Sequence, residues 1–210
     1  MYSFVSHTWN TVKGECSHGC SYCYMNNFGQ KKSVRFDHYE LKTNLGQGNY
    51  IFVGSSNDLF AEGIPSEWIQ MTIDHCNKFD NKYLFQSKNP ERINDFKLPA
   101  NSIVCTTIET NRVYPQIMNN CPSPEERAKA MENLSSSVST YVTIEPIMDF
   151  DLDELVKLIR KCNPVQVNIG ADSGGNQLPE PNKIKVMDLI DELTRFTTIN
   201  QKRNLGRIIR

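Results

Sequence analysis

The sequence lacks long apolar runs, a strong net charge and an even set of cysteines, and each absence excludes a class of protein. No stretch of its 210 residues approaches the length of a membrane span, and residues 1–7 lack the basic and apolar pattern of a signal peptide. A net charge of −1 creates no global field that would attract nucleic acid or acidic membranes. Seven cysteines, most of them dispersed, argue against a disulfide framework, so we expect a reducing cytoplasm and no membrane partner.

The chain also lacks repeats, low-complexity tracts and an evident linker. Its 39% hydrophobic residues are enough to form one core in a chain of this length. We therefore expect a single domain over residues 1–210, with a cysteine-rich loop at 14–24 and a basic C-terminal tail at 197–210.

Three cysteines near the start are the most informative feature that is present. Cys16, Cys20 and Cys23 follow the spacing C-x3-C-x2-C, with an aromatic residue, Tyr22, directly before the third. Three thiolates on one short loop can hold three corners of a cubane 4Fe-4S cluster. A fourth protein ligand does not follow at the usual distance, so one iron would stay open to a ligand that is not protein.

A zinc site is the alternative interpretation of this loop, formed by the same three cysteines together with His18. Zinc ligands usually come as two separated pairs, and three on one tight loop fit poorly. The spacing therefore favours the cluster. In that case His18 is expected to be a solvated loop residue.

Apolar or β-branched runs alternate with helical patterns along the chain, which predicts βα units and a parallel sheet. Six strands in about 200 residues are too few for a complete eight-stranded barrel of roughly 250, so a partial (β/α)6 barrel fits. The expected strands are residues 2–8, 50–56, 83–88, 102–109, 140–145 and 165–170. The expected helices are residues 65–79, a helix starting at the cap Ser123, 152–162 and 182–196.

Strand parity predicts what fills the barrel, because alternate residues of a strand point to opposite faces. One face of each expected strand is apolar and suits a layer of helices. The other face becomes polar toward the carboxyl end, where it carries Lys88, Glu109, Glu145 and Asp172. Each alone could be an exposed strand-end residue, but burying all four without partners would be costly. Together they predict a ligand site at the C-terminal mouth.

Five further segments appear in order over nearly the whole chain: residues 8–10, 52–60, 88–92, 144–146 and 170–175. With the cysteines, they resemble a phage-associated branch of the radical S-adenosylmethionine (SAM) superfamily. The SAM-site positions are similar to those of spore photoproduct lyase. The resemblance implies a TIM-like partial (β/α)6 barrel whose three cysteines hold a 4Fe-4S cluster with SAM on the open iron. It also implies reductive cleavage of SAM to a 5'-deoxyadenosyl radical, hydrogen abstraction from a substrate, and an electron donor such as flavodoxin or ferredoxin.

The same resemblance implies the contacts of SAM. Ser55 and Ser56 replace the Gly-Gly-Glu stretch that receives the SAM amino group, with Asp58 nearby, so either Ser56 or Asp58 takes the ammonium. Lys88 matches a lysine that pairs with the SAM carboxylate. The remaining implied contacts are ribose binding by Thr107 and Glu109, completion of the ribose or adenine side by Glu145 and Asn168, and adenine packing against the backbone of Tyr22.

Simpler interpretations stand beside several of these roles. Ser55 and Ser56 are also ordinary turn residues. Cys105 points inward by parity and is a candidate hydrogen donor to a substrate radical, although a small buried core cysteine is the commoner meaning.

The substrate is the least defined part of the prediction. Lys31, Lys32 and Arg35 follow the cysteine loop, and the tail at 197–210 carries four basic residues and no acid. Both segments could contact phosphates, which favours a nucleotide or nucleic-acid base over a small metabolite, an amino acid or a peptide. A charge run is also commonly a solvated face. The alternative function is a non-catalytic SAM- or metal-binding protein.

Overall fold

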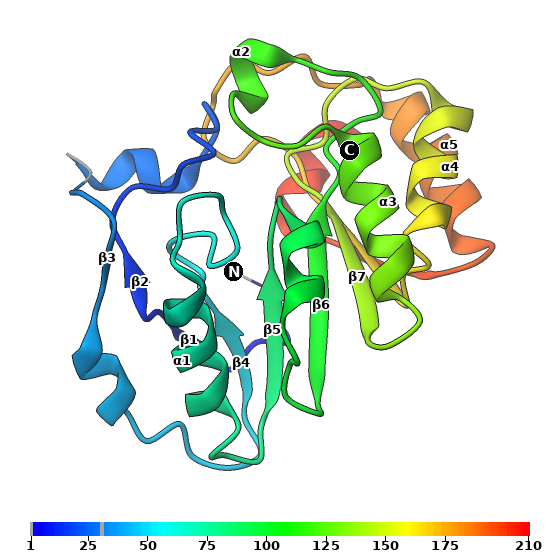
Figure 1. The fold of residues 1–210 in the computed structure, drawn as a ribbon. Helices are drawn as coiled ribbons and strands as arrows, with labels where there is room; N and C mark the ends of the chain where they lie inside the picture. Colours follow the sequence, from blue (N-terminus) through cyan, green and yellow to red (C-terminus); the bar gives the residue numbers. More distant parts are fainter. Residues whose placement is uncertain (1, 30–31) are drawn as a thin grey trace.

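A computed structural model describes residues 2–29 and 32–210, and at its centre lies a seven-stranded sheet whose neighbouring strands are all parallel (Figure 1). The strand order is β1-β4-β5-β6-β7-β8-β9, so β1 and β9 stand at opposite edges and the barrel is partial. The strands are β1 His7–Trp9, β4 Tyr50–Val53, β5 Lys82–Gln86, β6 Ser102–Thr107, β7 Ser139–Ile144, β8 Gln166–Ile169 and β9 Thr198–Gln201. The predicted fold class is confirmed.

Four long helices follow one another around one face of the sheet (Figure 1). Ser123 and Glu126 form the predicted capping box at the start of the second of them. These helices are α1 Ser66–Cys76, α3 Pro124–Leu134, α4 Leu152–Lys161 and α5 Lys183–Thr194. The shorter ones are η3 Pro90–Asp95, α2 Pro115–Met118, η4 Arg203–Leu205 and α6 Gly206–Ile209. Among the described residues, no helix is both long and apolar enough to cross a lipid bilayer.

The connection from β1 to β4 carries the cysteine loop and a small two-stranded antiparallel ribbon. The ribbon consists of β2 Val12–Lys13 and β3 Arg35–Phe36. The cysteine loop lies between β2 and the 3-10 helix η1 Tyr24–Phe28, and η2 His38–Lys42 follows β3.

The two faces of the sheet form separate apolar clusters, as strand parity predicts. Val53, Phe85 and Val104 belong to the large core that includes the helices. Leu84 and Cys105, on the opposite face, form a smaller cluster inside the partial barrel. The barrel interior is apolar at this smaller cluster and becomes polar only toward the carboxyl ends of the strands, where the site described below lies.

The N-terminal segment fills the barrel instead of forming the long strand expected over residues 2–8. The strand begins only at His7. Tyr2 and Phe4 stack at 5.1 Å between ring centroids, and the Phe4 ring meets the Tyr141 ring edge-on at 5.9 Å. An aromatic run suits both roles, and burial of the Tyr2 and Phe4 rings in the barrel prevailed over strand pairing.

The segment 197–210, expected to be a basic tail, continues the fold. It forms β9, which pairs with β8, and then η4 and α6. Leu205 is fully buried and Ile199 packs against the large core. The basic residues hid this apolar pattern, which is why the seventh strand was missed.

Candidate functional site

The cysteine loop consists of successive tight turns that bring Cys16, Cys20 and Cys23 to the wall of one hollow. The Gly19 amide donates to the Cys16 carbonyl at 3.3 Å, and the Cys23 amide to the Cys20 carbonyl at 3.2 Å. Gly14 opens the loop with a φ of +106°, where a Cβ would lie 2.5 Å from the Ser33 carbonyl oxygen. Only glycine fits there. All three thiols are free.

The hollow has a volume of about 640 Å³, including its solvent-exposed part, and lies at the carboxyl ends of the strands. Three neighbouring strands contribute to it. Besides the three cysteines, its lining includes Ser55 and Ser56 after β4, Lys88 after β5, and Thr107 at the end of β6. The predicted cluster loop and part of the predicted SAM site therefore share one hollow.

The three thiols fit the donor set of an iron-sulfur cluster better than that of a single metal ion. No group of three or more His, Cys, Asp or Glu side chains meets at one point in residues 2–29 and 32–210. A cubane does not require such a point, because each thiolate binds a different iron. The zinc alternative needs His18 as a fourth ligand, but His18 joins no such group of side chains among the described residues, and its Nε2 is hydrogen-bonded to Asp58.

Burial and neighbouring groups act differently on two of these thiols. The hydrogen bond with Cys121 lowers the pKa of Cys20 to about 6, against the opposing effect of burial. Burial raises the pKa of Cys16 to about 11, and the nearby Asp58 charge adds to this rise.

His18 is buried at 4% exposure, so the expectation of a solvated loop residue is wrong. Its Nε2 lies 2.8 Å from Asp58 Oδ2, which also accepts from the Lys88 amide at 2.8 Å and the Ser87 hydroxyl at 3.1 Å. The other Asp58 oxygen accepts from the Phe60 amide at 3.0 Å. Asp58 thus ties the cysteine loop to the end of β5.

Burial alone would raise the pKa of Asp58, but its hydrogen bond to His18 lowers it overall. The same pair raises the pKa of His18 against the effect of burial. The Asp58 carboxylate thus accepts from four protein donors, three on Oδ2 and one on Oδ1.

A second buried charge network joins Lys88, Glu109, Tyr22 and Arg127. The Lys88 ammonium lies 2.6 Å from Glu109 Oε1 and 2.6 Å from the Tyr22 hydroxyl. The Tyr22 hydroxyl donates to Glu109, and Arg127 Nη1 donates to the other Glu109 oxygen at 2.8 Å. Burial would raise the pKa of Glu109, but the charges of Arg127 and Lys88 outweigh it and lower this pKa to about 2. An ammonium has three N–H donors, and Glu109 and the Tyr22 hydroxyl accept two of those of Lys88, so the third is available to a ligand.

Arg127 is fully buried and was missed by sequence reasoning. Its Nη1 also donates to the Thr107 carbonyl at 2.6 Å, and its Nε donates to the Pro122 carbonyl at 2.8 Å. A signal was available, because Arg127 occupies a core-facing position of α3, one turn before Met131. A buried arginine at such a position requires an acidic partner.

The turn after β4, which lines the hollow, is held by short polar contacts. Asn10 Oδ1 accepts from the Ser56 amide at 2.8 Å and the Ser55 hydroxyl at 3.2 Å, so the predicted turn after β4 is fixed to the end of β1. At the end of β6, which also lines the hollow, the Thr107 hydroxyl accepts from Gln86 Nε2 at 3.2 Å.

Glu145 and Asn168 lie in a separate polar group over β7, β8 and the segment after β9. Glu145 accepts from Lys202 and, at 2.9 Å, from Asn204 Nδ2. Gly170 permits this approach, because a Cβ there would lie 2.6 Å from Glu145 Oε1. The buried Asn168 accepts from Gln166 and Asn200, both at 2.8 Å. None of these residues lines the hollow.

Two other inward residues stand apart from the hollow. Cys105 is fully buried in the small cluster with Tyr2, and burial raises the pKa of its thiol to about 12. Its surroundings agree with the core-cysteine interpretation. Asp172 accepts from the amides of Gly174 and Asn176, at 3.0 and 2.6 Å, and shapes the loop after β8.

The basic segment after the cysteine loop lies outside the hollow. Lys32 and Arg35 are exposed and line an adjoining depression together with Cys16 and Cys23. Lys31 lies outside the described residues. In the former tail, Arg207 pairs with Glu180 and donates to the Asp172 carbonyl.

No family model matches the sequence, and no curated protein matches it. Among solved structures, a spore photoproduct lyase variant matches at TM-score 0.67 and 11% identity, over 91% of this chain and 75% of that one. Spore photoproduct lyase complexed with dinucleoside spore photoproduct matches at TM-score 0.59 and 12% identity, over 89% of this chain and 60% of that one. Streptococcus suis SuiB bound to precursor peptide SuiA matches at TM-score 0.61 and 9% identity, over 96% of this chain and 50% of that one. The likeness establishes the fold, a partial barrel of the radical SAM type.

Proposed function

We propose that this chain is a radical SAM enzyme. One observation carries the proposal: Cys16, Cys20 and Cys23 share a hollow with the Ser55–Ser56 turn, Lys88 and Thr107. A protein that only held a metal ion would have no need of this polar wall opposite the cysteines. The parallel partial barrel, which is the fold of spore photoproduct lyase and SuiB, supports the same assignment.

In this proposal the three cysteines hold a 4Fe-4S cluster, and SAM binds in the hollow beside it. The bound cluster supplies one electron for the reductive cleavage of SAM, which produces the 5'-deoxyadenosyl radical for hydrogen abstraction. The chain itself positions the reactants, and Asp58 keeps the cysteine loop at a fixed place relative to β5 through His18 and the Lys88 amide. The electron comes from a donor such as flavodoxin or ferredoxin.

Lys88 and Ser56 are the residues that we assign to the two ends of the SAM methionine. The third donor of the Lys88 ammonium binds the carboxylate, while Glu109 keeps Lys88 charged and in place. We assign the SAM ammonium to Ser56 rather than Asp58, because the Asp58 carboxylate already accepts from four protein donors that fix it in place. Ser55 supports the turn.

The remaining predicted contacts keep their assignments, with two qualifications of geometry. Thr107 binds the ribose, whereas Glu109 is buried behind Lys88 and acts through it. Tyr22 contributes its backbone to adenine, since its hydroxyl is bound to Lys88. Two predicted roles concern residues outside the hollow: the far adenine side for Glu145 and Asn168, and hydrogen donation for Cys105, whose full burial favours a core role instead.

The substrate that we propose is a nucleotide or nucleic-acid base. The exposed Lys32 and Arg35 lie beside Cys16 and Cys23 and could contact phosphates near the site of radical formation. The structural neighbours include one complexed with a dinucleoside spore photoproduct and one bound to a precursor peptide. The resemblance to a phage-associated branch also favours nucleic-acid chemistry over a peptide.

An anaerobic cleavage assay tests the proposal. The protein is reconstituted with iron and sulfide, reduced with dithionite and mixed with SAM, and 5'-deoxyadenosine is quantified by chromatography. We expect deoxyadenosine from the wild type and none from Cys20→Ala. SAM binding without any cleavage would instead indicate a non-catalytic SAM-binding protein. Deuterium transfer from candidate nucleotides into deoxyadenosine would then identify the substrate.

A further inference from the structure

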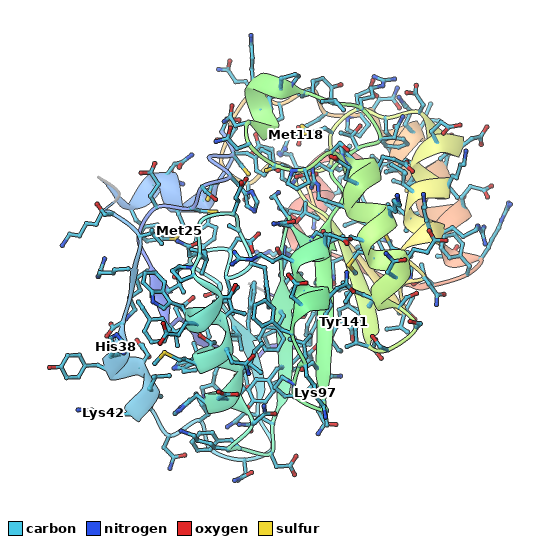
Figure 2. All side chains as sticks on the ribbon, in the orientation of Figure 1. Met25, His38, Lys42, Lys97, Met118 and Tyr141 are labelled. Atoms are coloured by element: carbon cyan, nitrogen blue, oxygen red, sulfur yellow. The ribbon has the colours of Figure 1, made fainter. Side chains whose placement is uncertain are left out.

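The segment that contains α2 and the residues after it is clamped onto the cysteine loop. The Ser21 amide donates to the Ile117 carbonyl at 3.0 Å, and the Asn120 amide to the His18 carbonyl at 3.1 Å. The side chains of Asn119 and Asn120 donate to two further carbonyls of the loop, at 2.5 and 3.0 Å. Figure 2 labels Met118 on α2 and Met25 on η1, the two elements that flank this contact. Four hydrogen bonds therefore fix one segment against the other.

Cys121 follows directly after this clamp and touches the central cysteine of the loop. Its Sγ lies 3.3 Å from the Sγ of Cys20, a distance at which one thiol can donate a hydrogen bond to the other. Cys20 is buried and Cys121 is partly buried, so the contact is largely shielded from water. Cys121 is not among the residues that line the hollow, so it meets Cys20 from another side than bound SAM would.

We propose that Cys121 is a positioning residue for the cluster: its thiol donates an S–H···S hydrogen bond to the sulfur of Cys20 and makes the cluster easier to reduce. The inference rests on the proposed function, because it presupposes that Cys20 binds iron. Reduction adds negative charge to the cluster and its sulfur ligands, and a donor beside one of them stabilises that charge. Hydrogen bonds to the sulfurs are among the factors that set the potential of such clusters.

A cross-linking experiment tests the contact without any cluster. In cluster-free protein carrying Cys16→Ser and Cys23→Ser, Cys20 and Cys121 are the only two thiols in hydrogen-bond contact among the described residues. Diamide accepts two electrons and two protons from a pair of thiols, which become one disulfide. We expect a Cys20–Cys121 peptide pair in the mass spectrum, lost again on reduction. Failure to cross-link would overturn the contact.

A redox titration followed by electron paramagnetic resonance tests the role. Cys121→Ala should lower the reduction potential by roughly 59 mV, corresponding to about a tenfold lower ratio of reduced to oxidised cluster at a fixed potential. Cys121→Ser keeps a donor and should stay near the wild type. Cys76→Ala, which removes a buried thiol from α1, is the matched control and should leave the reduction potential of the cluster unchanged.

The outcomes separate this inference from the proposed function. An unchanged potential in Cys121→Ala, with the cluster and SAM cleavage intact, would overturn the role of Cys121 alone. Loss of iron in Cys121→Ala but not in Cys76→Ala would make Cys121 a ligand and also overturn it. If the wild type itself bound no cluster, the proposed function would fail and the tuning role with it.

Discussion

The ammonium of Lys88 lies 2.6 Å from the carboxylate of Glu109, and this ion pair joins the carboxyl ends of β5 and β6. Glu109 is fully buried and Lys88 is 16% exposed, so the pair is directed from the core toward the hollow. The arrangement gives the hollow one cation whose charge is maintained from behind.

Replacing Lys88 with alanine should weaken SAM binding and leave the cluster intact. Loss of one charge-assisted contact costs about 2 kcal/mol, or about thirty-fold in affinity. Equilibrium dialysis of SAM against the reconstituted protein measures this. Lys161→Ala, which removes a partly exposed lysine paired with Glu125 outside the hollow, is the control. An unchanged dissociation constant for Lys88→Ala would remove Lys88 from the site.

Replacing Arg127 with methionine should destabilise the fold strongly. The change keeps most of the side-chain volume but leaves Glu109 with one cation fewer in a buried site, which typically costs about 3 kcal/mol or more. Anaerobic urea unfolding gives the free energy of unfolding. Lys161→Met breaks a solvent-accessible ion pair and should cost much less. Equal losses in both variants would contradict a buried role for Arg127.

The stability of the protein should depend on pH through Glu109. Its pKa in the folded state is about 2, below the ordinary 4.5, so its stabilising contribution is complete above about pH 4.5 and is lost as the pH falls toward 2. Glu109→Gln should show a shallower fall over this interval than the wild type. Urea midpoints measured between these pH values provide the test, and parallel curves would refute the assignment.

Much of the architecture could be predicted because strand parity is a strong constraint. Val104 and Cys105 are neighbours in sequence, yet one joins the helix-covered core and the other the barrel interior, as alternation requires. The cysteine spacing likewise identified the loop that lines the hollow. Local pattern was sufficient wherever the relevant neighbours belong to the same short segment.

The rest of the site depends on partners distant in sequence, which spacing does not reveal. His18 and Asp58 are 40 positions apart, and Cys20 and Cys121 are 101 apart. Likewise, nothing in the run of basic residues near the end of the chain indicates that Lys202 contacts Glu145. These pairings are produced by the folding of loops over the mouth of the sheet.

Neutralising the basic segment should weaken oligonucleotide binding if the substrate carries phosphates. Changing Lys31, Lys32 and Arg35 to alanine should make the salt dependence of binding shallower by about one unit per lost phosphate contact. Substrate-free SAM cleavage should change little. Fluorescence anisotropy at several salt concentrations measures the slope.

The controls for this experiment are Lys129→Ala and Lys183→Ala, which remove exposed lysines from α3 and α5. Arg207 would not serve as a control, because it is paired with Glu180. If changing Lys31, Lys32 and Arg35 to alanine left oligonucleotide binding unchanged, or if no binding occurred at low salt, the substrate would instead be an uncharged metabolite or a peptide.

The most direct test of the central claim is the metal content and paramagnetic spectrum of protein purified without oxygen. The account predicts about four iron atoms per chain, lost in Cys16→Ala, Cys20→Ala and Cys23→Ala alike, because two cysteines are too few to hold the cubane. The reduced cluster should give a spectrum that changes when SAM is added, since SAM binds the open iron. Stoichiometric zinc without iron, or a cluster spectrum indifferent to SAM, would contradict the account.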